Sequence, residues 1–261
     1  MTKVLVLDAG HGINTAGKRT INGSRGVIRE WTMNDSVVRK IIDMLSEYDV
    51  TIYRTDDSTG TNDISLTERV RRCNSYNPHL FVSIHHNAGG GTGTEVFWHT
   101  KGTSEDKKVA SIVAPKLASM CGVTNRGVRQ AQLGVLTCKA TAILVEGGFM
   151  DHKGDYELIT SEYGQKLYAK AVAESIVEYL GLKKKQDFSN TPTTSQISEP
   201  FKVKITCAEL NIRQSDNFDS KIMGTVKNGE VFTIIEEVNG LGRLKSGAGW
   251  ISLNRNYVKK I

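Results

Sequence analysis

Apolar runs of strand length alternate with amphipathic stretches of helix length over the first 182 residues of the chain. Within 104–120, for example, apolar residues recur at the spacing of one helix face. Strands that alternate with helices of this length favour an α/β fold, in which a mostly parallel sheet is covered by helices on both faces. The expected strands are 4–8, 50–54, 80–86, 94–99 and 142–146, and the expected helices are 30–48, 66–74, 104–120 and 161–180.

A polar segment at 183–200 separates this region from a shorter C-terminal part. The segment is rich in Ser and Thr, contains two of the 4 prolines and lacks helical or strand periodicity, so we expect a linker. Residues 201–261 contain short apolar runs between Gly and Asn turns, which predicts a small all-β barrel. The predicted domains are therefore 1–182 and 201–261. The core residues expected in the second domain are Leu210, Ile212, Val226, Val231, Ile234 and Trp250.

Charge and hydrophobicity indicate which classes of partner the sequence does not favour. Of the net charge of +6, residues 201–261 carry +4, from 10 basic and 6 acidic residues. This region lacks the basic stripe with interleaved aromatic residues that is typical of nucleic-acid binding. The chain also lacks an apolar run of the roughly 18 residues needed to span a membrane, and the about 7–15 apolar residues of a signal peptide. We therefore expect no nucleic-acid partner, no membrane partner and no signal peptide.

Polar side chains follow the ends of several predicted strands. His11 lies between two glycines after the first strand, and Glu146 ends the last one. His85 and His86 end the middle strand, and a second carboxylate, Glu30, opens the first long helix. Ligands bind beyond the carboxyl ends of strands in open α/β sheets. Two histidines and one carboxylate with an open fourth position form a catalytic zinc ligand set, which leaves the other glutamate free to act as a base.

Strand alternation distinguishes the two adjacent histidines. His85 shares a face with the polar residues Ser83 and Asn87, so we expect His85 and not His86 to point into the site. Each residue also has a structural explanation, since Glu30, for instance, would favour the positive end of its helix. Glu30 and Glu146 are also consistent with the carboxylate pair of a glycosidase. The residues by themselves indicate a metal-dependent hydrolase and do not assign the ligand and the base between the two glutamates.

Four short motifs stand in a fixed order along the first domain. The motifs are LDAGHG at 7–12, Glu30, FVSIHHNA at 81–88 and LVEGGF at 144–149. Together they resemble the zinc-dependent N-acetylmuramoyl-L-alanine amidases of the type-3 amidase family, and the resemblance covers residues 1–180. A small residue is more usual in that family at the position of His86, and a leucine is more usual at Gly147.

The resemblance implies a reaction and a role for each site residue. It implies that His11, Glu30 and His85 bind Zn²⁺ and that Glu146 is the catalytic residue. It further implies a peptidoglycan hydrolase that cleaves the amide between N-acetylmuramic acid and the L-alanine of the stem peptide. A non-catalytic wall-binding protein is the alternative if the first domain binds no zinc.

The C-terminal part resembles bacterial SH3-like wall-binding domains through LNIR at 210–213 and GWI at 249–251. This resemblance implies that the second domain binds peptidoglycan and anionic wall polymers. Without a signal peptide, the expected function is that of a phage or prophage endolysin, held in the host cytoplasm until lysis and then acting on the cell wall. An amidase that acts on the mother-cell wall in sporulation is the alternative.

Overall fold

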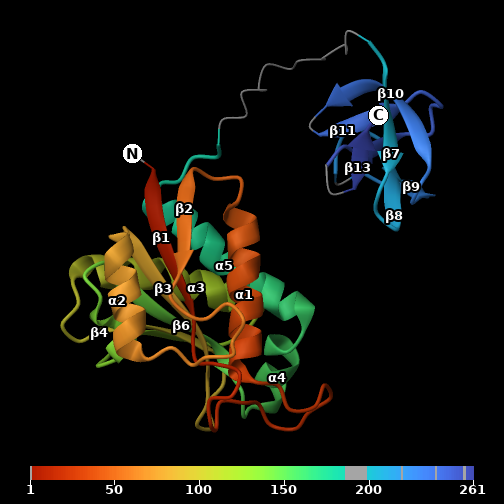
Figure 1. The fold of residues 1–261 in the computed structure, drawn as a ribbon. Coiled ribbons are helices and arrows are strands. Elements are labelled where there is room, and N and C mark those ends of the chain that lie inside the picture. The colour runs from red at the N-terminus through yellow and green to blue at the C-terminus, as the bar shows by residue number, and fades with distance from the viewer. Residues whose placement is uncertain (1, 186–198, 219, 239, 255–256) are drawn as a thin grey trace. The chain divides into compact units, whose positions relative to one another are not determined.

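The chain folds into two compact units, Met1–Lys185 and Gln186–Ile261 (Figure 1). The structure is a computed structural model, and it describes residues 2–185, 199–218, 220–238, 240–254 and 257–261. Most of the predicted linker at 183–200 lies outside the described residues.

A six-stranded sheet forms the centre of the first unit, with the strand order β2-β1-β3-β6-β4-β5. All neighbouring strands are parallel except β4 and β6, so the predicted mostly parallel sheet is confirmed. Because β4 is antiparallel to β6, the beginnings of β4 and β5 lie at the same edge of the sheet as the ends of β3 and β6. The strands are β1 (Lys3–Ala9), β2 (Val50–Arg54), β3 (Leu80–Asn87), β4 (Thr94–His99), β5 (Asn125–Ala131) and β6 (Thr141–Phe149).

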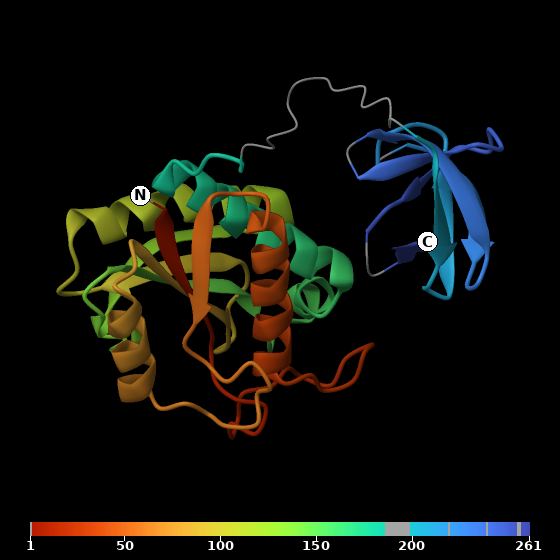
Figure 2. The ribbon, with the colours of Figure 1, turned by 45° about the horizontal axis from the view of Figure 1, so that its top comes forward.

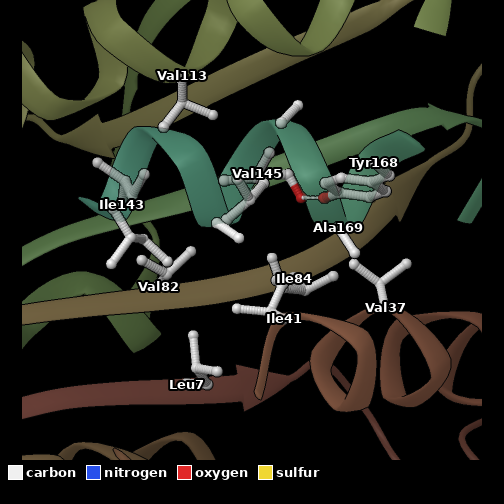
Figure 3. Close-up of a cluster of buried hydrophobic side chains, with 14 of the residues drawn as sticks. Leu7, Val37, Ile41, Val82, Ile84, Val113, Ile143, Val145, Tyr168 and Ala169 are labelled. Atoms are coloured by element: carbon white, nitrogen blue, oxygen red, sulfur yellow. Dashed lines mark hydrogen bonds between the residues drawn. The ribbon is translucent and has the colours of Figure 1, made fainter. Parts of the chain in front are cut away.

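Helices cover both faces of this sheet, as predicted (Figures 1 and 2). The helices α1 (Glu30–Leu45), α3 (Ser104–Cys121) and α5 (Glu162–Leu180) pack on one face. The helix α2 (Leu66–Tyr76) and the short 3₁₀ helix η1 (Gly134–Thr137) pack on the other. Figure 3 shows side chains of the first core: Leu7, Val82, Ile84, Ile143 and Val145 from the sheet, and Val37, Ile41, Val113, Tyr168 and Ala169 from the helices.

The ends of the long helices follow local sequence signals. α3 begins with a capping box, in which Thr103 and Asp106 each bond to the other's backbone N–H, and it ends at Gly122 in the left-handed conformation. α1 ends at Leu45, three residues earlier than its apolar pattern predicts. Three elements of this unit were not predicted: β5, whose sequence NRGVRQA lacks apolar alternation, the 3₁₀ helix η1, which has only 4 residues, and α4 (Lys153–Ile159), which has only 7.

The second unit is a seven-stranded antiparallel sheet with the order β13-β7-β10-β11-β12-β8-β9, in agreement with the predicted all-β class. Leu210, Val226 and Ile234 are buried in its core, but Val231 is 47% exposed, so its expected burial is wrong. Val231 begins β10, and the inward side of that strand falls on Phe232 and Ile234. The strands are β7 (Phe201–Ile205), β8 (Glu209–Arg213), β9 (Ile222–Lys227), β10 (Val231–Val238), β11 (Leu241–Leu244), β12 (Trp250–Ser252) and β13 (Val258–Lys260).

Across the described residues of both units, none of the helices is sufficiently long and apolar to cross a membrane.

Candidate active site

Three of the predicted site residues lie together at one edge of the sheet in the first unit. A nitrogen of His11, a nitrogen of His85 and a carboxylate oxygen of Glu30 all lie within 4.8 Å of one another. Glu30 Oε1 is 3.2 Å from His85 Nδ1 and 3.4 Å from His11 Nε2. The three residues come from the loop after β1, the start of α1 and the end of β3. Two imidazoles and one carboxylate at this spacing form a ligand set that suits Zn²⁺.

The backbone around His11 brings the two imidazole rings together. His11 has a φ of 67°, in the left-handed region that residues other than glycine rarely adopt. A Cβ atom at Gly10 would collide with the His85 ring, so only glycine lets the loop pass this close to β3. The rings of His11 and His85 then meet edge to face, with their centroids 4.9 Å apart.

His86 points away from the site, as strand alternation requires. Its buried Nδ1 lies 2.8 Å from Oδ1 of Asn34 on α1, and its ring meets the edge of Tyr168. Burial lowers the pKa of the His86 imidazole to about 4, so the ring is neutral at pH 7. The backbone N–H of His86 donates to Glu30 Oε1 at 3.2 Å. His86 therefore contributes its backbone to the site, where it holds the carboxylate of Glu30.

Glu146 lies beside His85, because the register of β3 and β6 pairs these two residues. Its Oε2 atom is buried, and no hydrogen-bond partner for it occurs within the described part of the chain. Burial raises the pKa of the Glu146 carboxyl group well above its ordinary value. The charge of Glu30 acts in the same direction, while that of Lys18 opposes it. A carboxyl group with a raised pKa is suited to accepting and releasing a proton during a reaction near neutral pH.

Unpartnered buried atoms show that the three grouped residues fit a metal ion. Counting only residues that the structure describes, His11 Nε2 and Glu30 Oε2 are both buried without a hydrogen-bond partner, although such atoms normally have one. Burial alone would raise the pKa of Glu30, but the polar contacts and charges of His11 and His85 at its Oε1 atom outweigh burial and hold this pKa below its ordinary value. Glu30 is therefore a carboxylate, the form that binds a metal ion.

A buried ion pair between Arg69 and Asp8 holds the segments that carry His11 and His85. Ser83 Oγ lies 3.1 Å from His85 Nε2 and donates a 2.7 Å hydrogen bond to Asp8 Oδ2. Arg69 on α2 is 2% exposed, and its Nη1 donates to Asp8 Oδ1 at 2.6 Å. Its Nη2 donates to the carbonyl oxygen of His11 at 2.8 Å. One guanidinium thus fixes both the loop that carries His11 and the carboxylate that contacts the His85 strand.

The site opens into a cavity of about 570 Å³. Glu146, His85 and Glu95 line its polar side. Glu95 is not among the predicted site residues, because polar groups were expected after the strands and Glu95 is the second residue of β4. The apolar part of the lining comes from the start of α2, from around η1 and from the strands β4 and β6, and it comprises Ile64, Leu66, Leu133, Val135, Phe97 and Leu144.

Comparison with known proteins finds a matching family model, similar sequences and similar solved structures. The model of a family described as N-acetylmuramoyl-L-alanine amidase matches residues 5–178. An endolysin of Bacillus phage SPP1 is 31% identical over 276 residues, which cover 99% of this chain and 98% of that protein. The sporulation-specific N-acetylmuramoyl-L-alanine amidase of Bacillus subtilis is 30% identical over 85% of each chain. The solved catalytic domain of CwlV, an N-acetylmuramoyl-L-alanine amidase of Bacillus (Paenibacillus) polymyxa, superposes with a TM-score of 0.63 at 28% identity, covering 69% of this chain and 99% of that one.

Proposed function

This chain belongs to the N-acetylmuramoyl-L-alanine amidase family, and on that premise we propose how it hydrolyses peptidoglycan. The bond cleaved is the amide between the lactyl group of N-acetylmuramic acid and the first L-alanine of the stem peptide. We assign Zn²⁺ binding to His11, Glu30 and His85, and proton transfer to Glu146. The observation that carries this proposal is the convergence of His11, Glu30 and His85 within 4.8 Å, beside a carboxyl group whose Oε2 is buried and unpartnered.

The two glutamates have different environments, which support different roles. Glu30 is 0% exposed and contacts both histidines, so its carboxylate is committed to the ligand set. Glu146 has no such contact, and its raised pKa favours proton uptake. The commitment of Glu30 also argues against a glycosidase, since that reaction requires two carboxyl groups that are both free to act on the substrate.

Glu146 moves the proton in the proposed reaction. Bound zinc would supply Lewis-acid chemistry, polarising the amide carbonyl and lowering the pKa of the attacking water. Glu146 accepts a proton from that water as its oxygen attacks the carbonyl carbon. Glu146 then transfers the proton to the amide nitrogen as the carbon–nitrogen bond breaks. The products are a lactyl carboxylate on the sugar and a free amino group on L-alanine.

We propose that the chain acts as an endolysin on the cell wall. The phage endolysin matches nearly the full chain, including the second unit, whereas the sporulation amidase covers 85% of it. We further propose that the second unit is an SH3-like domain that binds peptidoglycan and anionic wall polymers. Its net charge of +4, carried by residues 201–261, supports binding to a polyanion. Wall binding would hold the catalytic unit close to an insoluble substrate.

Two glutamine variants test the assigned roles. Glu146→Gln keeps all three proposed ligands, so it should retain about one zinc per chain and lose roughly 10²–10⁴-fold in turnover of a soluble muropeptide. Glu30→Gln should lose zinc affinity and activity together, because it weakens the ligand set. Glu174→Gln, an exposed change on α5, is the control and should alter neither. If Glu146→Gln loses zinc while Glu30→Gln retains it, the two roles are reversed.

A further inference from the structure

Site residues continue across the sheet beyond Glu146. The register pairs His85 with Glu146, and pairs Glu146 with Glu95 on the next strand, β4. Paired residues on neighbouring strands share one face of a sheet, so the three side chains form a row. The Glu95 side chain is 6% exposed and lines the same cavity as Glu146. A buried carboxylate beside the proposed base requires compensation of its charge.

Two arginines of β5 provide this compensation. Arg126 Nε lies 3.0 Å from Glu95 Oε2, and Arg129 Nε lies 2.7 Å from the same atom. Asn87 donates to the other oxygen, Oε1. Both arginines bind Glu95 through Nε, and among the residues that the structure describes no protein acceptor is found for their terminal Nη groups. Two guanidinium groups therefore neutralise one carboxylate and leave an excess charge of +1 with free donors.

A bulge in β5 explains why both arginines reach one carboxylate. Residues three apart on a regular strand point to opposite faces. Here the register pairs Asn125 with Thr94 and Val128 with Val96, so three steps along β5 match two along β4. Gly127 has a φ of 87°, a conformation typical of glycine at such a bulge. The extra residue turns Arg126 and Arg129 toward the same side, and bulges beside active sites often redirect side chains in this way.

The guanidinium groups are held in place yet accessible. Arg126 stacks over the Phe149 ring, with Cζ 4.8 Å from the ring centroid. The side chains of Arg126 and Arg129 remain 31% and 48% exposed. Fixed guanidinium groups with free Nη donors match the planar geometry of a carboxylate, which they bind through paired hydrogen bonds.

We propose that Arg126 and Arg129 form a carboxylate-binding subsite for the stem peptide on the leaving-amine side of the scissile bond. This proposal rests on the proposed amidase function. β5 lies two strand spacings from β6, or roughly 10 Å from the strand of Glu146. An extended peptide covers about 3.3–3.6 Å per residue. The subsite therefore binds an acidic residue about two or three positions from the amino terminus that cleavage creates on the stem peptide. As a result, the enzyme prefers stem peptides with free carboxylates to amidated ones.

Two muramoyl peptides that differ only in those carboxyl groups test the preference. One carries free carboxylates at the second and third peptide positions, and the other carries carboxamides there. The wild-type enzyme should cleave the acidic peptide with a kcat/KM roughly 10- to 100-fold higher, mainly through a lower KM, because hydrogen bonds between charged groups are strong. Equal kcat/KM values for the two peptides would overturn the proposal, and this comparison needs no variant.

Variants then assign the preference to the arginines. Arg129→Met and Arg126→Met should each bring the ratio of kcat/KM for the acidic peptide over the carboxamide peptide close to 1, with about one zinc per chain retained. Arg129→Lys should recover part of the preference, since lysine keeps the charge without the paired donors. Arg71→Met, which removes an exposed arginine of α2, should keep the full preference. Equal losses on both peptides would reject the subsite, whereas failure of the wild type to cleave either peptide would reject the amidase function itself.

Discussion

Replacement of Arg69 by methionine should destabilise the catalytic unit far more than replacement of a neighbouring arginine on the same helix. Arg69 is 2% exposed, and its guanidinium donates to Asp8 and to the carbonyl oxygens of Ile64 and His11. Methionine has similar length and no donors, so Arg69→Met leaves the buried Asp8 carboxylate without its cation. The Asp8 carboxylate would then accept side-chain hydrogen bonds only from the hydroxyl groups of Thr55 and Ser83.

The expected loss follows from the burial of this pair. Removal of one partner from a buried ion pair typically costs about 3–5 kcal/mol, because the remaining charge stays desolvated. For a domain of 150–250 residues, each kcal/mol changes the melting temperature by roughly 2–4 °C. Arg69→Met should therefore lower the melting temperature of the first unit by roughly 6–20 °C. Because Asp8→Asn removes the stranded charge, adding it to Arg69→Met should recover part of the loss.

Arg71→Met is the matched control. Arg71 lies two residues further along α2 and pairs with Glu68, but its side chain is 68% exposed, so water screens the interaction. Thermal unfolding should be followed by circular dichroism with excess chelator, since a bound metal would add its own stabilisation. Equal melting temperatures for the two variants would refute the inference that the Arg69–Asp8 pair holds the catalytic unit together.

Three further predictions concern the metal, the second unit and pH. Chelation should abolish hydrolysis reversibly, and metal analysis after zinc is restored should give about one ion per chain; full activity in a metal-free sample would contradict the zinc assignment. A chain ending at residue 185 should still cleave soluble muropeptides but bind intact walls less well. The wall binding of the full chain should weaken as the salt concentration rises, because exposed charges are screened over about 10 Å at 0.1 M. Burial alone would raise the pKa of Asp8, but the Arg69 charge and three side-chain hydrogen bonds outweigh burial and lower this pKa. Asp8 therefore stabilises the fold above its unfolded pKa of about 3.9, and this stabilisation falls as the pH drops below that value. Urea unfolding at decreasing pH should show a smaller loss of stability for Asp8→Asn than for the wild type.

Periodicity predicted most of the first unit because its central strands are buried on both faces and its long helices have one apolar face. The position of a residue at a strand end was then enough to identify His11, His85 and Glu146 as candidates, and the start of the first long helix identified Glu30. The sequence could not assign the two glutamates by itself, because their difference depends on contacts between segments distant along the chain. Glu30, for instance, contacts His85 across 55 positions.

Three features of the site were beyond sequence reasoning for physical reasons. Arg69 is buried, whereas a lone arginine in a polar helix is expected to be exposed, and its partner Asp8 is 61 positions away. The antiparallel direction of β4 brings Glu95 to the active edge from the start of a strand. β5 contains Gly127 and two arginines in place of alternating apolar residues, so it resembled a loop. Glycine next to paired charges after a helix is the signal that could have indicated a bulged strand.

The row formed by His85, Glu146 and Glu95 links hydrolysis to the fidelity of strand pairing during folding. Side chains alternate along a strand, so a slip of one residue between β3 and β6 would turn the Glu146 side chain to the opposite face. Val145 or Gly147 would then stand beside His85, even if the chain had become compact and regained its helices. Recovered activity after refolding would thus report correct strand register, which spectroscopic measures of helix content or compactness do not detect.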